Sequence, residues 1–253
     1  MDINIIQALL IAFVGYSAAR WAIPLGDFGW WTIGRPLVAG MVIGFILGDV
    51  AYGIMLGAAI NSLYLGAITV GGVTASDINF AAYIGIPLAM ASGATVSEGL
   101  ALAALLGALG IFMWNFVKII NVYWIRVMER HLAKGDLDKA ARVPITGNIF
   151  LFIGRFVPIF LACYLGPELM QQFMNAIPPY INLIVGIFGG MLPIIGFAII
   201  LKASVKRNFE LIYFVFGFVL FVNFNVSVIA ILVVAIVFAL VDFRYGNTTG
   251  GNA

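Results

Sequence analysis

Residues 228–241 read VIAILVVAIVFALV, a stretch in which every side chain is apolar. A strand of a membrane-spanning barrel alternates apolar and polar residues, and this stretch does not alternate. A helix that is apolar on all sides is typical of an apolar surrounding such as a lipid bilayer. The stretch therefore predicts a membrane helix, and we interpret the rest of the chain from it.

The composition of the whole chain agrees with a membrane location. Apolar residues make up 63% of the 253 residues and charged residues 9%, whereas soluble domains have about 45–50% and about 25%. So few charges could not cover the surface of a soluble fold, which excludes an ordinary cytosolic enzyme, a nucleic-acid binder and a disordered protein. The net charge of +2 predicts no polyanionic partner. We expect an all-α polytopic membrane protein, with residues 1–253 in a single integral-membrane domain.

The apolar stretches have unequal lengths, although one crossing needs about 20 apolar residues. The stretch 36–48 is short, 169–201 is long and contains prolines, and 71–79 is polar and rich in glycine. Irregular backbone at membrane depth is tolerated only where protein or a water-filled cavity surrounds it. We therefore predict a helical bundle with broken or re-entrant helices, as in transporters that bind a solute near the membrane midplane.

One clearly hydrophilic segment, 126–142 (RVMERHLAKGDLDKAAR), indicates the orientation. Its basic residues predict a cytoplasmic loop, because lysine and arginine are enriched on that side of membrane proteins. A second basic cluster, Lys202 with Lys206 and Arg207, is expected on the same side. The intervening chain would cross out and back, with a turn near 166–180. Whether 211–241 crosses once or folds back stays open.

Polar side chains inside apolar stretches are the candidate functional residues, because they are costly at membrane depth unless paired. They are Gln7, Asp49, Asn61, Ser62, Thr69, Asp77 and the pair Asn223 and Asn225. Asp77 has an alternative role as the N-cap of a helix starting near Ile78, and Asp49 could mark a helix end after Gly48. Asn61 is the strongest candidate, because its amide can both donate and accept hydrogen bonds to a ligand hydroxyl.

Other residue types limit the chemistry. The single cysteine, Cys163, and the single histidine, His131, leave no cysteine cluster or multi-histidine set, so we expect no metal and no cofactor. Cys163 is expected to be inert packing, and His131 to be a surface residue. Glycines at four-residue spacing (Gly40, Gly44, Gly48; Gly53, Gly57) predict tight helix packing in a compact helical bundle. Their faces could also pack against a partner subunit or a second copy of the chain, which the sequence does not distinguish.

Three blocks together suggest a family: RPLVAGMVIGFILGDVAYGIMLG (35–57), AAINSLYLGAITVGG (58–72) and SDINFA (76–81). With Gln7 and GGMLPIIGFAIILK (189–202), they resemble the enzyme IIC subunit of the mannose–fructose–sorbose family of bacterial phosphotransferase systems. The family often has Glu where this chain has Asn61, in the run GAAIN (57–61), which leaves the sugar open.

The resemblance implies a multi-pass subunit of the bacterial inner (cytoplasmic) membrane that translocates a hexose-type sugar and belongs to an oligomer. It implies an enzyme IID membrane partner and separate cytoplasmic IIA and IIB carriers, with IIB phosphorylating the sugar. This chain itself would hold no phosphorylated residue. The expected sugar-binding residues are Gln7, Asn61, Thr69 and Asp77, supported by Asp49, Ser62 and Asn223. The basic segment 126–142 would either dock the phosphoryl donor or only fix the topology.

Two other functions remain as alternatives at this point. A stand-alone ion-coupled transporter would use a proton or sodium gradient, but the stretches 178–201 and 211–241 lack the clear mid-helix ionisable residues typical of such transporters. A non-transporting scaffold or receptor would be expected to display a sizeable soluble domain, which the sequence lacks. The source of energy separates the first alternative from sugar phosphotransfer.

Overall fold

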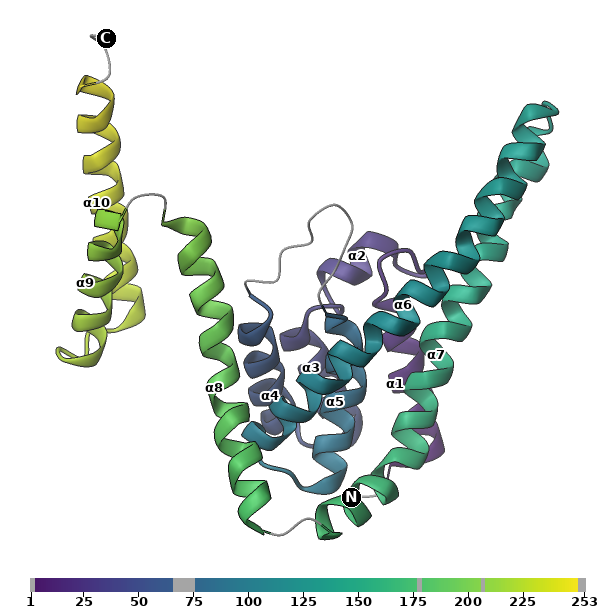
Figure 1. The fold of residues 1–253 in the computed structure, drawn as a ribbon, viewed down its shortest axis with the longest axis horizontal. Coiled ribbons are helices and arrows are strands. Elements are labelled where there is room, and N and C mark those ends of the chain that lie inside the picture. The colour runs from purple at the N-terminus through teal and green to yellow at the C-terminus, as the bar shows by residue number, and fades with distance from the viewer. Residues whose placement is uncertain (1–2, 66–75, 177–178, 206–207, 250–253) are drawn as a thin grey trace. The chain divides into compact units, whose positions relative to one another are not determined.

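The computed structural model describes residues 3–65, 76–176, 179–205 and 208–249 (Figure 1). These residues form helices and no strand, as the apolar patterns predict. The contacts of the chain divide it into two compact units, Met1–Ile200 and Leu201–Ala253, and the single integral-membrane domain stays a prediction. The first unit contains α1 (Ile5–Ser17), α2 (Gly26–Trp31), α3 (Pro36–Leu47), α4 (Val50–Leu63), α5 (Ile78–Ser92), α6 (Val96–Ala133), α7 (Leu137–Ala176) and most of α8 (Pro179–Ser204).

Helix α5 is the centre of the first unit. It contacts α1, α3, α4, α6 and α7, and every residue from Asn79 to Ala91 is buried. The helix begins at Asp77, whose side chain caps it, and ends at Gly93, which adopts φ +70°. Helix α5 is apolar and is enclosed by five other helices, so its first turn is held firmly inside the protein.

The glycine-rich block forms a tight hairpin of α3 and α4. A Cβ on Gly40 would collide with the carbonyl oxygen of Gly53, and a Cβ on Gly57 would collide with that of Pro36. These glycines therefore pack against each other within one chain, which confirms the predicted tight packing of a compact helical bundle. The small-residue spacing predicts a close approach but cannot say which helix approaches.

Short helices in this hairpin agree with the predicted re-entrant elements. Helix α3 has 12 residues and α4 has 14, so at 1.5 Å per residue they are about 18 and 21 Å long. The hydrocarbon core is about 30 Å thick. Neither helix is long enough to cross the core alone, as expected for a re-entrant hairpin.

Helices α6 and α7 are long and apolar enough to cross a membrane, and they run side by side to a shared tip (Figure 1). Outward-facing side chains such as Phe112 and Ile119 are 73% and 70% exposed, as expected for contact with lipid. The segment 126–142 is not a loop but this tip, helical except for Lys134–Asp136. Arg, Glu, Lys and Ala favour helix, so both helices continue past their apolar spans until Gly135, at φ +74°, reverses the chain.

The second unit is a helical hairpin. Helix α9 (Leu211–Val222), preceded by the short 3-10 helix η1 (Asn208–Glu210), packs on α10 (Val228–Thr249). Region 211–241 therefore folds back, the second of the two possibilities. The reversal contains Asn223, which follows the last turn of α9, and Asn225, which has φ +50°. The unit consists mainly of this local hairpin, which explains why its contacts separate from those of the first unit.

Candidate functional site

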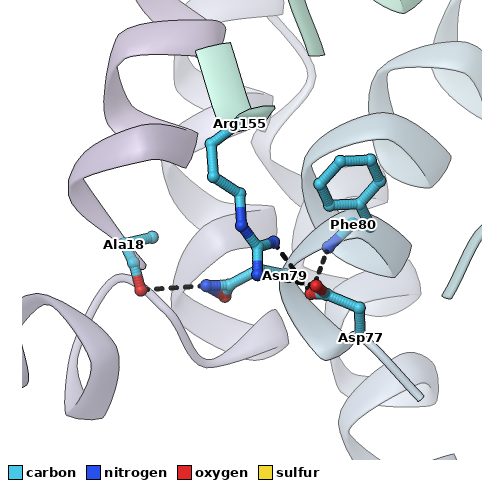
Figure 2. A network of polar contacts seen from close by, with 5 residues as sticks. All are labelled: Ala18, Asp77, Asn79, Phe80 and Arg155. Carbon is cyan, nitrogen blue, oxygen red and sulfur yellow. Dashed lines mark hydrogen bonds and ion pairs between the residues drawn. The ribbon is translucent and has the colours of Figure 1, made fainter. Parts of the chain in front are cut away.

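A buried ion pair joins the start of α5 to the middle of α7. Arg155 Nη2 lies 2.6 Å from Asp77 Oδ2, and Arg155 Nη1 donates to Asp77 Oδ1 at 2.9 Å (Figure 2). The side chains are only 4% and 5% exposed. Two parallel N–H···O bonds give this pair a defined orientation, which a single contact would not.

Asp77 is also the N-cap of α5, as the alternative role of this residue predicts. Its Oδ1 accepts a hydrogen bond from Phe80 N at 3.1 Å, and its own backbone N–H donates to Gly107 O of α6 at 2.8 Å. The carboxylate therefore satisfies a free N–H of the first turn while it neutralises Arg155. Asp77 links three helices, and both of its carboxylate oxygens are engaged.

Aromatic rings surround the Arg155 guanidinium on its other sides. Its Cζ lies 5.0 Å from the ring centre of Phe80 and 5.1 Å from that of Trp114. Such cation–π contacts are attractive, most of all where water is excluded. Asn79 is next to this cluster: its Nδ2 donates to Ala18 O at 2.9 Å, while its buried Oδ1 has no hydrogen-bond partner among the described residues.

The ion pair lies at membrane depth. Arg155 follows the charged residue Arg142 by about 20 Å of helix at 1.5 Å per residue, and the sequence between them is uncharged. Ionisable residues inside the hydrocarbon region face protein or a water-filled cavity and mark functional sites more often than elsewhere. The pair is therefore an internal feature of the membrane-embedded part.

A cavity of about 500 Å³ lies where α3 begins and α4 ends, beside the first residue of α5. Its lining includes the polar residues Asn61, Tyr64 and Arg35, and also Ile78. The amide of Asn61 makes no hydrogen bond to any residue that the structure describes. Arg35 has no acidic partner within the same residues, and its Cζ lies 4.2 Å from the ring centre of Trp31. The cavity therefore presents an amide, a phenol and a guanidinium to a ligand.

The cavity and the ion pair are neighbours. Ser76 Oγ donates to the hydroxyl oxygen of Tyr64 at 3.3 Å, and Ile78, the residue after Asp77, is part of the cavity wall. Three consecutive residues, 76–78, thus contact the cavity lining or the ion pair. The first turn of α5 connects the two features.

The predicted site residues do not all meet here. Gln7 Nε2 donates to Ile46 O at 3.0 Å, and its Oε1 accepts from Asn4 N in the capping box of α1. Ile46 lies near the end of α3 opposite to Pro36, which lines the cavity, and the two are about 15 Å apart along the helix. The structure therefore brings Asn61 and the start of α5 together but leaves Gln7 at the far end of α3.

The remaining candidates have local roles or lie elsewhere. Asp49 caps α4 by accepting a hydrogen bond from Tyr52 N, directly after Gly48 ends α3 at φ +92°, so it marks the helix boundary as the alternative suggests. Ser62 Oγ donates to Ala58 O one turn earlier in its own helix. Asn223 lies in the second unit, and Thr69 lies outside the described residues.

A second cavity, of about 490 Å³, lies between α6 and α7 toward their tip. Trp21, Trp114 and Trp124 contribute to its lining together with Asn121 and Asn148. It is distinct from the cavity at Asn61, because the two share no lining residue. The cavity at Asn61 fits a solute site better, because it lies among the ends of interrupted helices.

Arg155 and Arg35 are the polar residues that sequence reasoning missed as site residues. Arg155 is the single charge between Arg142 and Glu168, which is a signal that the sequence does contain. Arg35 begins the RPL block but was interpreted only as part of the motif. Among the described residues, no group of three His, Cys, Asp or Glu side chains could hold a metal ion.

The fold defines a polytopic helical membrane protein, in which a cavity of about 500 Å³ lies at the ends of short helices. Residues 5–241 match the family described as "PTS system sorbose-specific iic component". The chain belongs to this family of phosphotransferase IIC components, which confirms the resemblance and the function expected from it, a sugar-translocating IIC subunit. Family membership also decides against the stand-alone ion-coupled transporter.

Individual relatives agree with this assignment. The chain is 26% identical over 258 residues to the mannose-specific EIIC component of Escherichia coli (strain K12), across 100% of this chain and 95% of the relative. A solved structure described as "Structure of membrane protein" matches with a TM-score of 0.81 at 24% identity, over 96% of this chain and 97% of that chain, and supports the fold. The mannose transporter ManYZ in complex with microcin E492 matches with a TM-score of 0.59 at 25% identity, over the same shares of both chains.

Proposed function

We propose that the chain binds a hexose-type sugar in the cavity at Asn61 and moves it across the bacterial cytoplasmic membrane as a multi-pass subunit. The observation that carries the proposal is the amide of Asn61, which faces a cavity of about 500 Å³ and bonds to no described residue. Ligand cavities of about 300–1,000 Å³ with a few fixed polar groups are typical of small-molecule sites.

The cavity lining suits a polyhydroxylated ligand. The Asn61 amide can accept a hydrogen bond from one sugar hydroxyl and donate a hydrogen bond to another. The phenol of Tyr64 can also both donate and accept, whereas Arg35 can only donate. A sugar that lacks one hydroxyl would leave such a group without a partner, which costs about 1–3 kcal/mol. The site would therefore discriminate between sugars by the position of their hydroxyl groups. The family and the relative are named for different sugars, so the identity of the sugar is part of the test.

The four expected sugar-binding residues have different parts in this proposal. Asn61 contacts the sugar, and Thr69, which lies outside the described residues, stays a predicted sugar-binding residue. Asp77 acts from behind the site, because its carboxylate already bonds to Arg155. Gln7 bonds to Ile46 O at the other end of α3, so in this proposal it supports that helix and does not contact the sugar. Ser62 supports the end of α4, and Asp49 the turn between α3 and α4, while Asn223 remains a candidate supporting residue.

The energy for import comes from other polypeptides in this proposal. A IID membrane subunit completes the transporter, an assignment that the likeness to ManYZ supports. A cytoplasmic IIB subunit, itself recharged by IIA, transfers its phosphoryl group to the sugar, and this chain carries no phosphorylated residue. The IIB subunit docks at the α6–α7 tip, whose basic residues Arg130 and Lys134 suit a phosphorylated partner. His131, in the last turn of α6, belongs to this surface.

Replacing Asn61 by Leu tests the sugar site. The substitution keeps the number and branching of the side-chain heavy atoms but removes both hydrogen-bonding atoms, so uptake of radiolabelled mannose, sorbose and fructose should fall at least about tenfold. Ser92→Ala is the control: Ser92 Oγ donates to Ala89 O in its own helix, and Ser92 does not line the cavity, so uptake should stay near that of the unaltered chain. Both variants should reach the membrane in normal amounts. Normal uptake by Asn61→Leu would remove the cavity from the proposal.

A further inference from the structure

We infer that Arg155 is a positioning residue for the sugar site, which holds the cavity wall in place through Asp77 rather than by touching the sugar. The inference rests on the proposed function, because it takes the cavity at Asn61 as the site. It assigns a role to a residue in the middle of α7, a helix that contributes no residue to that cavity.

The first step is the strength of the connection between α7 and α5. Arg155 forms two charge-assisted bonds to Asp77, of 2.6 and 2.9 Å, and both side chains are at least nine-tenths buried. Water therefore does not compete for either partner, and the paired geometry fixes the angle as well as the distance. Phe80 and Trp114 leave the guanidinium little freedom to turn away.

The second step is the short path from this pair to the cavity. Asp77 is flanked by Ser76, which bonds to Tyr64, and by Ile78, which lines the cavity together with Asn61. A shift of Asp77 would move both neighbours, because they are joined to it by the backbone. A misplacement of about 1 Å can lower activity about 100-fold in a preorganised site.

The third step is that stability alone does not require these charges. Replacing a buried ion pair by apolar residues of similar volume is often neutral or stabilising, whereas removing one partner leaves an uncompensated buried charge. A role in fixing the geometry accounts for a paired charge at membrane depth. The same asymmetry provides the test, because single and double substitutions should behave differently.

The experiment uses the full chain, produced in bacteria with its IID, IIA and IIB partners. The unaltered chain is first tested with radiolabelled mannose, sorbose and fructose, and the sugar that it imports fastest is chosen. Initial uptake rates of this sugar at several concentrations then give KM and Vmax. Asp77→Asn and Arg155→Gln should each lower uptake at least about tenfold, since each leaves one buried charge unpaired. Asn keeps the N-cap, so the double variant Asp77→Asn/Arg155→Gln, which leaves no buried charge unpaired, should recover the membrane abundance of the unaltered chain but keep a KM raised at least about threefold, because it lacks the paired bonds.

Arg155→Lys separates positioning from simple support of the fold. Lysine keeps the charge but not the paired bonds, so KM should rise about tenfold while Vmax and membrane abundance change little. A purely structural role would lower abundance and Vmax and leave KM unchanged. Cys163 reports folding in every variant: it is fully buried in the described structure, so a maleimide should label it only if the protein has opened.

Two results would overturn the inference. If the double variant Asp77→Asn/Arg155→Gln has the KM of the unaltered chain, the paired bonds do not set the site. If Arg155→Lys and Arg155→Gln keep the KM of the unaltered chain, Arg155 does not set the site. Asn61→Leu, measured in parallel, distinguishes these failures from a failure of the proposed function, since normal uptake by that variant would move the sugar site itself.

Discussion

At the residue scale, Asp77 illustrates what the sequence can and cannot predict. The order SDINFA places a carboxylate directly before an apolar run, and this local pattern predicts the N-cap of α5. Its partner Arg155 is 78 positions away, and no local pattern identifies that pairing. Arg155 stands out as a lone charge in an apolar stretch, but the side chain it meets depends on how α5 and α7 pack.

Substitutions of Asn79 and Asn61 should affect different properties: the first should lower stability, and the second should lower sugar uptake. Asn79 is fully buried and bonds to Ala18 O, so Asn79→Ala should lower stability by about 1–3 kcal/mol and lower the melting temperature of the detergent-purified protein. Its KM for sugar should change little, because Asn79 does not line the cavity. Asn61→Leu should leave the melting temperature nearly unchanged and abolish uptake. Equal losses of stability in the two variants would contradict the assignment of Asn61 to ligand binding.

At the element scale, the sequence predicts which helices are irregular but not how they pair. The short stretch 36–48 and the glycine spacing predict a broken, closely packed element, and α3 with α4 is such a hairpin. The glycine spacing predicts tight packing in a bundle but does not identify the helix that comes close, which the structure shows to be the other helix of the same hairpin. Likewise the charges of 126–142 predict that this segment lies outside the apolar part of the protein. In the structure the segment is not a loop but the end of α6 and the start of α7.

The α3–α4 hairpin should not tolerate a side chain at its contact. Gly53→Ala would place a Cβ against the carbonyl oxygen of Gly40, which is backbone and cannot turn aside. Overpacking of this kind costs about 1–3 kcal/mol, and the melting temperature and the folded yield in detergent should fall. Gly217→Ala is the matched control, because the nearest atom to its Cβ would be Ile231 Cγ2 at 3.9 Å. Equal stability of the two variants would show that the hairpin is looser than described.

At the scale of the whole molecule, composition already determines the class, since a chain with 9% charged residues and 63% apolar residues needs an apolar surrounding. The sequence motifs add the family, and residues 5–241 confirm it. Neither gives the division into two units, because it depends on which helices contact each other. Nor does either locate the cavity, which is formed by the ends of α3, α4 and α5 from separate parts of the chain.

The central claim is that the sugar lies against Asn61 in the cavity held by the start of α5. A cryo-EM structure of the chain with its membrane partner and bound sugar tests this claim most directly. We expect sugar density within hydrogen-bonding distance of the Asn61 amide, with Asp77 still paired to Arg155 behind it. Sugar density in the cavity between α6 and α7, with the cavity at Asn61 unchanged, would contradict the account.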